Sequence, residues 1–113
     1  METIIFTINK SKFLPYFFNI KSKDELTKNL IELKTVHKKA KHICYAYIID
    51  EKNKGFFDDK EPKGTAGMPL LKLLEMKKIT NGLIVVVRYF GGIKLGAGKL
   101  LRSYVKAANL ILN

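Results

Sequence analysis

Five consecutive aliphatic residues, Leu83 to Val87, constrain the fold of this 113-residue chain more than any other feature. A strand with no polar position has no face suited to water, so the run predicts a central strand that is buried on both faces. Half of the chain's eight glycines then fall within eight residues, namely Gly91, Gly92, Gly96 and Gly98. The buried strand therefore leads into a glycine-rich loop.

The remaining patterns predict alternating strands and helices. Ser22 and Glu25 form a capping box ahead of an apolar repeat with helical spacing. Pro15 predicts that its strand lies at a sheet edge or carries a bulge, and Thr65 is expected to cap a second helix. We predict strands at residues 3–8, 13–20, 42–50 and 83–87, a polar loop at 51–64, and helices at 23–38, from 65 onward, and at 97–112.

This order of elements, ββαβαβα, predicts an α+β fold in one domain spanning residues 1–113. We expect a mixed sheet with the helices packed on one face. No apolar stretch approaches 18 residues and no apolar segment follows a basic N-terminus, so we predict neither a membrane span nor a secretion signal. Cys44 is the only cysteine, which excludes an internal disulfide and suits a reducing, cytoplasmic location.

The net charge of +11 favours a polyanionic partner such as RNA, DNA or a ribosome surface. Only two of the 21 basic residues are arginine, and an AT-rich genome gives a lysine bias without any selection for binding. The position of the charge is therefore more informative than its total. The stretch from Gly91 to Asn113 carries four basic residues and no acid.

Glycines between a buried strand and a helix let backbone N–H groups point outward together, beside the partial positive charge of the helix N-terminus. We interpret this loop, with Lys94 and Lys99, as an anion site. It is not a P-loop, because Ile93 and Leu100 stand where that motif needs glycine and a magnesium-binding hydroxyl. It is not a dinucleotide fingerprint either, because Leu101 replaces the third glycine.

The last predicted helix places Lys99, Arg102, Ser103 and Lys106 on one face. Two interpretations stay open, a solvated basic face behind a tight turn or a ridge that contacts phosphates. On the second interpretation the phosphate- or nucleic-acid-binding residues are Arg88, Gly91, Gly92, Lys94, Gly96, Gly98, Lys99, Arg102 and Lys106.

An acidic loop precedes the second predicted helix and contains Asp58, Asp59, Glu61 and Thr65. Clustered carboxylates could hold Mg²⁺ or act as a base, or could cap a helix and pair with basic side chains. We assign no catalytic residue, cofactor or metal ligand. Cys44, His37 and His42 are interpreted as structural, and Phe56-Phe57 either pins the loop to the body or offers a stacking platform.

Four segments resemble the YigZ/IMPACT family, over about residues 10–112. They are KSKF at 10–13, HICYAY at 42–47, DDKEPKGTAGMP at 58–69 and VRYFGGIKLGAG at 87–98. Three positions depart from the family pattern. Lys60 and Lys99 stand where glycine is usual, and Met68 stands where arginine is common.

The resemblance implies a ribosomal-protein-like βαβ fold, shared with RNA-binding domains of translation proteins and with a class of small-molecule kinases. It implies a link to translation, since the eukaryotic member interferes with activation of a stress kinase that phosphorylates an initiation factor. It brings no secure catalytic activity. Bacterial members usually carry a second, ferredoxin-like domain, so we expect a single-domain or truncated form here.

Our leading hypothesis is a non-enzymatic module that binds RNA or the ribosome and acts in regulation of translation or the stress response. The alternative is an enzyme or binding protein for a phosphorylated small molecule or nucleotide, which would use both loops. A protein-interaction adaptor is the third possibility. Closure of loop 58–65 against loop 91–98 would favour the alternative, whereas separation would leave an open basic ridge.

Overall fold

A computed structural model describes residues 3–112 and shows a five-stranded sheet with strand order β1-β2-β5-β3-β4. The strands are β1 (Phe6–Ile8), β2 (Ser11–Asn19), β3 (His42–Asp50), β4 (Asn53–Phe57) and β5 (Gly82–Tyr89). The helices are α1 (Lys23–Val36), α2 (Gly67–Met76) and α3 (Ala97–Asn109). The predicted α+β class is confirmed.

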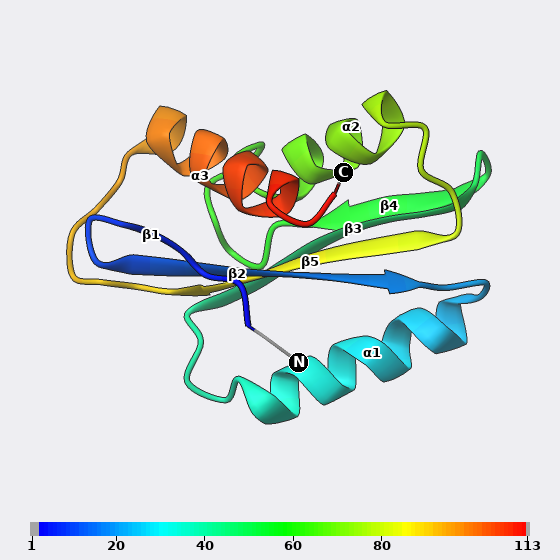
Figure 1. Ribbon diagram of the computed structural model, residues 1–113, viewed down its shortest axis with the longest axis horizontal. Coiled ribbons are helices and arrows are strands. Elements are labelled where there is room, and N and C mark those ends of the chain that lie inside the picture. The colour runs from blue at the N-terminus through cyan, green and yellow to red at the C-terminus, as the bar shows by residue number, and fades with distance from the viewer. Residues whose placement is uncertain (1–2, 113) are drawn as a thin grey trace.

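Strand β5 lies at the centre of the sheet, as the aliphatic run predicts, and every residue from Gly82 to Arg88 is buried. Its side chains alternate between two separate cores. Leu83, Val85 and Val87 pack with α1, whereas Ile84 and Val86 pack with α2 and α3. Helix α1 covers one face of the sheet, and α2 with α3 covers the other (Figure 1).

Two details of the prediction are wrong. The sheet is antiparallel in every recorded strand pair and not mixed. The helices lie on both faces and not on one. The physical reason is the aliphatic run itself, because a strand that is apolar on both faces needs an apolar layer on each side.

Strand β4 occupies part of the predicted loop at 51–64. It pairs only with β3 at the edge of the sheet, and Asp50 holds the turn between them by accepting from the backbone N–H of Lys52 (2.8 Å) and Asn53 (2.9 Å). An edge strand tolerates polar residues on both faces. Its sequence therefore lacks the apolar alternation by which strands are recognised.

The predicted cap of α1 by Ser22 is confirmed, but the Glu25 half of the capping box is shifted by one residue, to the N–H of Lys21. Ser22 Oγ accepts from the Glu25 N–H (3.2 Å), and Glu25 Oε1 accepts from the Lys21 N–H (2.9 Å). The predicted cap of α2 is wrong. Its N-cap is Ala66, and the Thr65 hydroxyl donates to the Pro62 carbonyl (2.5 Å) instead.

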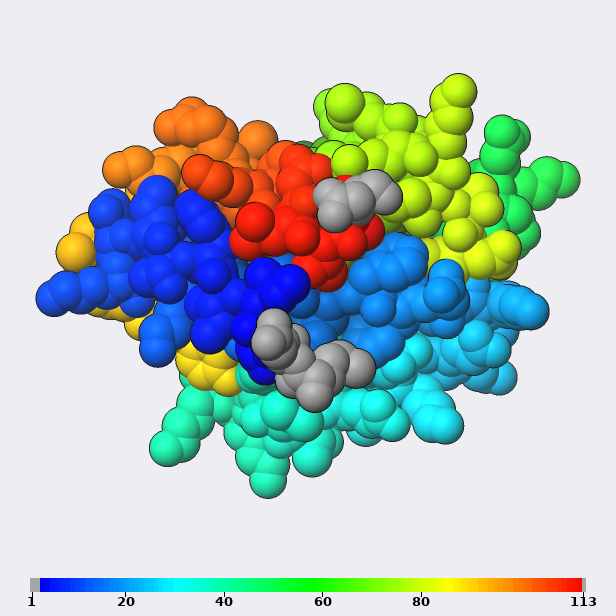
Figure 2. Space-filling model, in the orientation of Figure 1, coloured from blue at the N-terminus to red at the C-terminus, as the bar shows by residue number. Residues whose placement is uncertain are grey.

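Pro15 lies on β2 opposite Val86 of β5, beyond the three-residue stretch that pairs with β1. On its other side no strand within residues 3–112 pairs with β2 at this position, which agrees with the edge prediction. In Figure 2 the N-terminal strand segment lies directly against helix α3. None of the helices between residues 3 and 112 has the length and apolar character needed to cross a membrane.

His37 at the end of α1 is held between two tyrosines of the sheet. Its Nε2 lies 2.8 Å from the Tyr16 hydroxyl and its Nδ1 lies 2.6 Å from the Tyr89 hydroxyl. Burial lowers the pKa of His37 below its ordinary value of 6.5. The imidazole is therefore kept neutral more strongly in the folded protein than in the unfolded chain.

This linkage predicts a loss of stability in acid. Because the unfolded chain takes up the proton first, the free energy of unfolding should fall as the pH drops below about 6.5. The measurement is urea unfolding at pH 7.5 and pH 5.5 for the native chain and for His37→Gln. We expect a smaller acid-induced loss in the variant, and an equal loss in both proteins would contradict the assignment.

Candidate functional site

The glycine loop between β5 and α3 packs tightly against the turn that joins β1 and β2. A Cβ atom on Gly91 would lie 2.1 Å from the Lys10 carbonyl carbon and 2.5 Å from the Ser11 nitrogen. The Gly91 N–H also donates to Ser11 Oγ (3.2 Å). This close approach brings Lys10 and Lys12, which are both exposed, to the same end of the molecule as the glycine loop.

The N-terminus of α3 faces outward with no side-chain cap. Gly96, its N-cap, has φ of 77°, a left-handed conformation that glycine adopts without steric cost. The first turn carries no acidic residue. The first N–H groups of α3 therefore have no side-chain acceptor among the described residues. The anion site that the sequence predicts for this loop stays a prediction.

Helix α3 presents an exposed row of basic side chains beyond that turn. Lys99, Arg102 and Lys106 are exposed, as is Lys94 in the loop before the helix. None of the four takes part in an ion pair with another described residue. Lys106 Nζ lies 5.2 Å from the centre of the Phe6 ring, which links this row to β1. We call Lys10, Lys12, Lys94, Lys99, Arg102 and Lys106 the basic surface.

Two residues assigned to this ridge from the sequence lie elsewhere. Ser103 is buried, and its hydroxyl donates to the Lys99 carbonyl (2.7 Å). The Arg88 side chain is only 7% exposed, and its Nη1 donates to both carboxylate oxygens of Glu61 at 2.7 and 3.0 Å. Arg88 is thus part of a buried ion pair and not of the exposed ridge.

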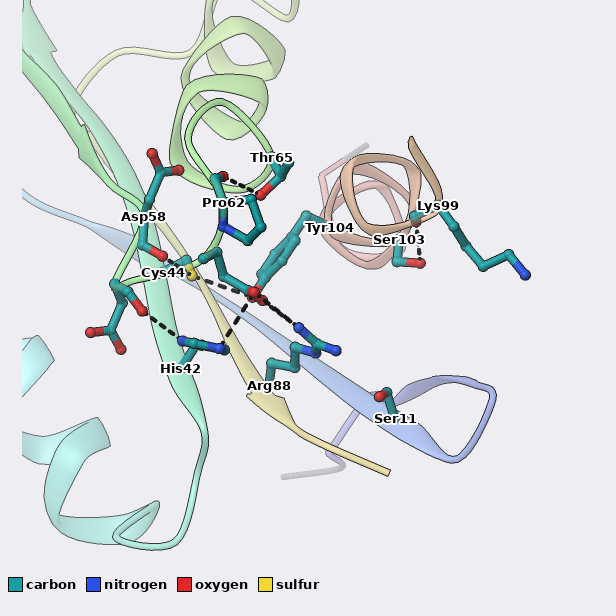
Figure 3. A network of polar contacts seen from close by, with 12 residues as sticks. Ser11, His42, Cys44, Asp58, Pro62, Thr65, Arg88, Lys99, Ser103 and Tyr104 are labelled. Carbon is teal, nitrogen blue, oxygen red and sulfur yellow. Dashed lines mark hydrogen bonds and ion pairs between the residues drawn. The ribbon is translucent and has the colours of Figure 1, made fainter. Parts of the chain in front are cut away.

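Residues of four separate segments meet at the Glu61 carboxylate. Besides Arg88 of β5, it accepts a hydrogen bond from the Tyr104 hydroxyl of α3, and His42 Nε2 of β3 lies 3.4 Å from its Oε1. Figure 3 shows Arg88, Tyr104 and His42 converging on this point. Burial raises the pKa of Tyr104, so its hydroxyl remains a donor. Nothing in the sequence reveals that Glu61 is the polar partner of Tyr104.

The other acidic-loop residues make structural contacts. Asp58 Oδ1 accepts from the Gly67 N–H (2.7 Å) at the start of α2, and Asp59 Oδ2 accepts from the Ile43 N–H (2.6 Å). The Asp59 carbonyl lies 2.6 Å from His42 Nδ1. These contacts match the capping interpretation of the loop. Across residues 3–112 the structure brings together no three acidic, histidine or cysteine side chains that could hold a metal ion.

The two loops border one pocket. Glu61 and Pro62 of the acidic loop and residues 94–97 of the glycine loop line a pocket of about 480 Å³, together with Lys41, His42, Arg88, Phe90 and Leu100. A pocket shared by both loops is a feature that the nucleotide hypothesis requires. The pocket adjoins the basic surface, and the two share Lys94.

The remaining candidates from the sequence contribute packing. Cys44 is fully buried, as predicted, and burial raises the pKa of its thiol, so the reactive thiolate is disfavoured. Phe56 and Phe57 belong to β4. The Phe57 ring lies 5.6 Å from Tyr45, and Phe56 lies beside Gly67 at the start of α2, so the pair pins this segment to the body.

Comparison with known proteins identifies the family. The model of the Impact N-terminal domain matches residues 9–112, which is nearly the whole chain. The chain belongs to the Impact N-terminal domain family. This membership confirms the resemblance seen in the four sequence segments.

Individual relatives agree with the assignment. The IMPACT family member YvyE of Bacillus subtilis is 41% identical over 108 residues, which cover 94% of this chain and 50% of that protein. A crystal structure of a hypothetical protein superposes with a TM-score of 0.92 at 34% identity, covering 97% of this chain and 55% of that chain. The chain therefore spans about half the length of these relatives.

A more distant likeness shows the fold alone. The structure of the two-domain translational regulator Yih1 superposes with a TM-score of 0.55 at 22% identity, covering 96% of this chain and 44% of that chain. The Impact domain fold is thus present both in a close relative and in a protein of low sequence identity.

Proposed function

We propose that this Impact domain is a binding module that attaches to RNA, alone or within a ribosome, through the basic surface. The observation that carries the proposal is the exposure of six cations, from the β1–β2 turn, the glycine loop and α3, without an acidic partner among the described residues. Such a group of unpaired cations attracts a phosphate backbone and releases the counterions that surround it.

The fold separates the basic surface from acidic side chains elsewhere in the molecule. Asp24, Glu25 and Glu32 belong to α1 on the other face of the sheet, and the carboxylate of Glu61 is neutralised by Arg88. The β1–β2 turn, the glycine loop and α3 therefore carry only positive charge, whereas α1 carries charges of both signs. Uneven charge of this kind orients a polyanion during approach.

Phe90 offers a contact of a different type. This residue is 46% exposed at the start of the glycine loop, so a base could stack on its ring. The neighbouring Tyr89 is less available, because its hydroxyl lies 2.6 Å from His37 Nδ1. Phosphate contacts would then supply most of the affinity, with one stacking position beside them.

The proposed link to translation rests on family membership. The chain matches the model of the Impact N-terminal domain. Yih1, which shares the fold, is described as a translational regulator. We therefore extend the proposal: the protein acts in the cytoplasm and takes part in the regulation of translation, including regulation under stress. We propose no catalytic role, because the buried carboxylate, thiol and phenol lack an arrangement of nucleophile and base.

The proposal predicts a specific loss of RNA affinity when Arg102 and Lys106 are both changed to glutamate. Affinity for a fluorescently labelled single-stranded RNA is measured by anisotropy across a salt series. The slope of log K against log salt should fall by roughly 0.7 for each phosphate contact that is lost. At low salt we expect an affinity at least about ten-fold weaker than that of the native chain.

The chain offers a matched control on the opposite face. Lys28→Glu with Lys34→Glu makes the same charge change on α1, and Lys34 lies in the last turn of its helix as Lys106 does in α3. This variant should keep the native salt slope. Equal losses in both double variants would show attraction by net charge only and would overturn the proposal, as would RNA affinity that does not depend on salt.

A further inference from the structure

The pocket between the two loops has a polar floor and an apolar wall. Arg88 and Glu61 lie on the polar side with Lys41 and Lys94 beside them, and Pro62, Phe90, Leu95 and Leu100 provide apolar surface. A volume of about 480 Å³ is in the range of small-molecule sites. A ligand that fits both parts needs an anionic end and a flat or apolar end.

Arg88 has unused hydrogen-bonding capacity. Both of its recorded hydrogen bonds use Nη1, so Nη2 makes no recorded hydrogen bond, and the side chain lines the pocket. Its Nε also has no partner among the described residues, but protein atoms enclose it. A guanidinium N–H that is not already bonded is a group that proteins commonly use to hold phosphate.

A second positive element borders the same pocket. Gly96 and Ala97, at the uncapped start of α3, both line it. The 13 residues of this helix give its N-terminus a partial positive charge, and the free N–H groups there are anion donors. The helix terminus and the Arg88 guanidinium are independent features, and they adjoin one cavity.

The charges around the pocket favour an anion with more than one charge. Arg88 and Glu61 neutralise each other, so the excess comes from Lys41 and Lys94, both exposed at the rim, and from the α3 terminus. A phosphate monoester carries about −1.5 to −2 at neutral pH, whereas a carboxylate carries −1. The excess therefore matches a phosphate monoester better.

We propose that this pocket binds a phosphate monoester attached to a flat ring system, as in a nucleoside monophosphate. The phosphate lies at the start of α3 within reach of Arg88 and Lys94, and the ring lies against Phe90 and Leu95. Free nucleotide and the phosphorylated 5′ end of an RNA are two sources of the same chemistry. The pocket shares Lys94 and Phe90 with the proposed RNA contacts. The inference is still separate from the RNA proposal, because Arg88 and the start of α3, which would hold the phosphate, lie outside the basic surface.

The test is an NMR titration of the full chain with adenosine 5′-monophosphate and, separately, with adenosine. The readouts are the backbone N–H resonances of Ala97 and Gly98 and the Nε–H resonance of Arg88. We expect these signals to move on addition of the monophosphate, and an affinity for adenosine at least about ten-fold weaker, since a charge-assisted contact is missing. A separate pair of RNA oligomers, with and without a 5′-phosphate, distinguishes the two sources.

Ala97→Glu is the informative variant, because Ala97 is exposed and a carboxylate at the first turn favours the helix while repelling phosphate. We expect at least about ten-fold weaker binding of the monophosphate. Thr27→Glu makes the same charge change on exposed α1 and should leave binding unchanged.

A phosphate-dependent response from either source, lost in Ala97→Glu, supports the pocket. Equal binding of adenosine and its monophosphate, no response to any probe, or equal effects of Ala97→Glu and Thr27→Glu overturns it. Arg102→Glu with Lys106→Glu keeps the two proposals distinguishable, because it should weaken RNA binding and leave the monophosphate affinity unchanged.

Discussion

Changing Glu61 to alanine should lower the free energy of unfolding by about 3–5 kcal/mol, because it leaves the Arg88 guanidinium buried without a counterion. The Glu61 side chain is 3% exposed and that of Arg88 is 7% exposed. The change also removes the acceptor of the Tyr104 hydroxyl. The total free energy of unfolding of a native protein is only about 5–15 kcal/mol. Urea unfolding should therefore show a large shift of the midpoint.

The chain contains a matched exposed pair for comparison. Lys54 Nζ and Glu75 Oε2 are 2.9 Å apart, close to the 2.7 Å of the buried pair, but their side chains are 39% and 44% exposed. Glu75→Ala should therefore change stability little, because solvent screens the interaction. A Glu61→Leu, Arg88→Met double variant should recover much of the loss by removing both charges. Equal effects of Glu61→Ala and Glu75→Ala would contradict this account.

Changing Gly91 to alanine should lower the free energy of unfolding by at least about 3 kcal/mol, which is the upper end of the usual effect of overpacking. The added methyl would lie 2.1 and 2.2 Å from the carbonyl carbon and oxygen of Lys10, and these backbone atoms cannot move aside as a side chain can. Relief requires the β1–β2 turn and the glycine loop to separate. Thermal unfolding followed by circular dichroism measures the effect.

Gly98→Ala is the control within the same loop and helix. A Cβ atom there has Arg102 Nη1 as its nearest neighbour at 3.3 Å, and that atom ends a flexible side chain. Since alanine favours a helix over glycine, stability should be unchanged or higher by up to about 1 kcal/mol. Similar melting temperatures for the two alanine variants would show that the loop and turn are not tightly packed.

The sequence contained the evidence for two helical layers. The run from Leu83 to Val87 has no polar position, which already requires cover on both faces, and the prediction of helices on one face did not use that consequence. The antiparallel pairing and the edge strand at Asn53–Phe57 were harder to recognise. Pairing is decided by contacts between distant segments, and a polar edge strand has the composition of a loop.

The candidate site was also predictable from the sequence only in part. Helical spacing correctly predicted an exposed basic row at Lys99, Arg102 and Lys106, because that face depends only on local periodicity. Arg88 was assigned to the row because it is close in sequence to the glycine loop. Because side chains alternate along β5, the Arg88 side chain lies instead on the same face of the sheet as Ile84 and Val86, which is the face that α3 covers. Its pairing with Glu61, 27 residues earlier, depends on the tertiary fold.

RNA is expected to contact the α3 end of the molecule. An NMR titration of the isotope-labelled chain with single-stranded RNA tests it directly, since each backbone N–H reports its own surroundings. Resonances of the β1–β2 turn, the glycine loop and the exposed face of α3 should move, while those of α1 stay in place. Shifts centred on α1, or none at low salt, would contradict the account.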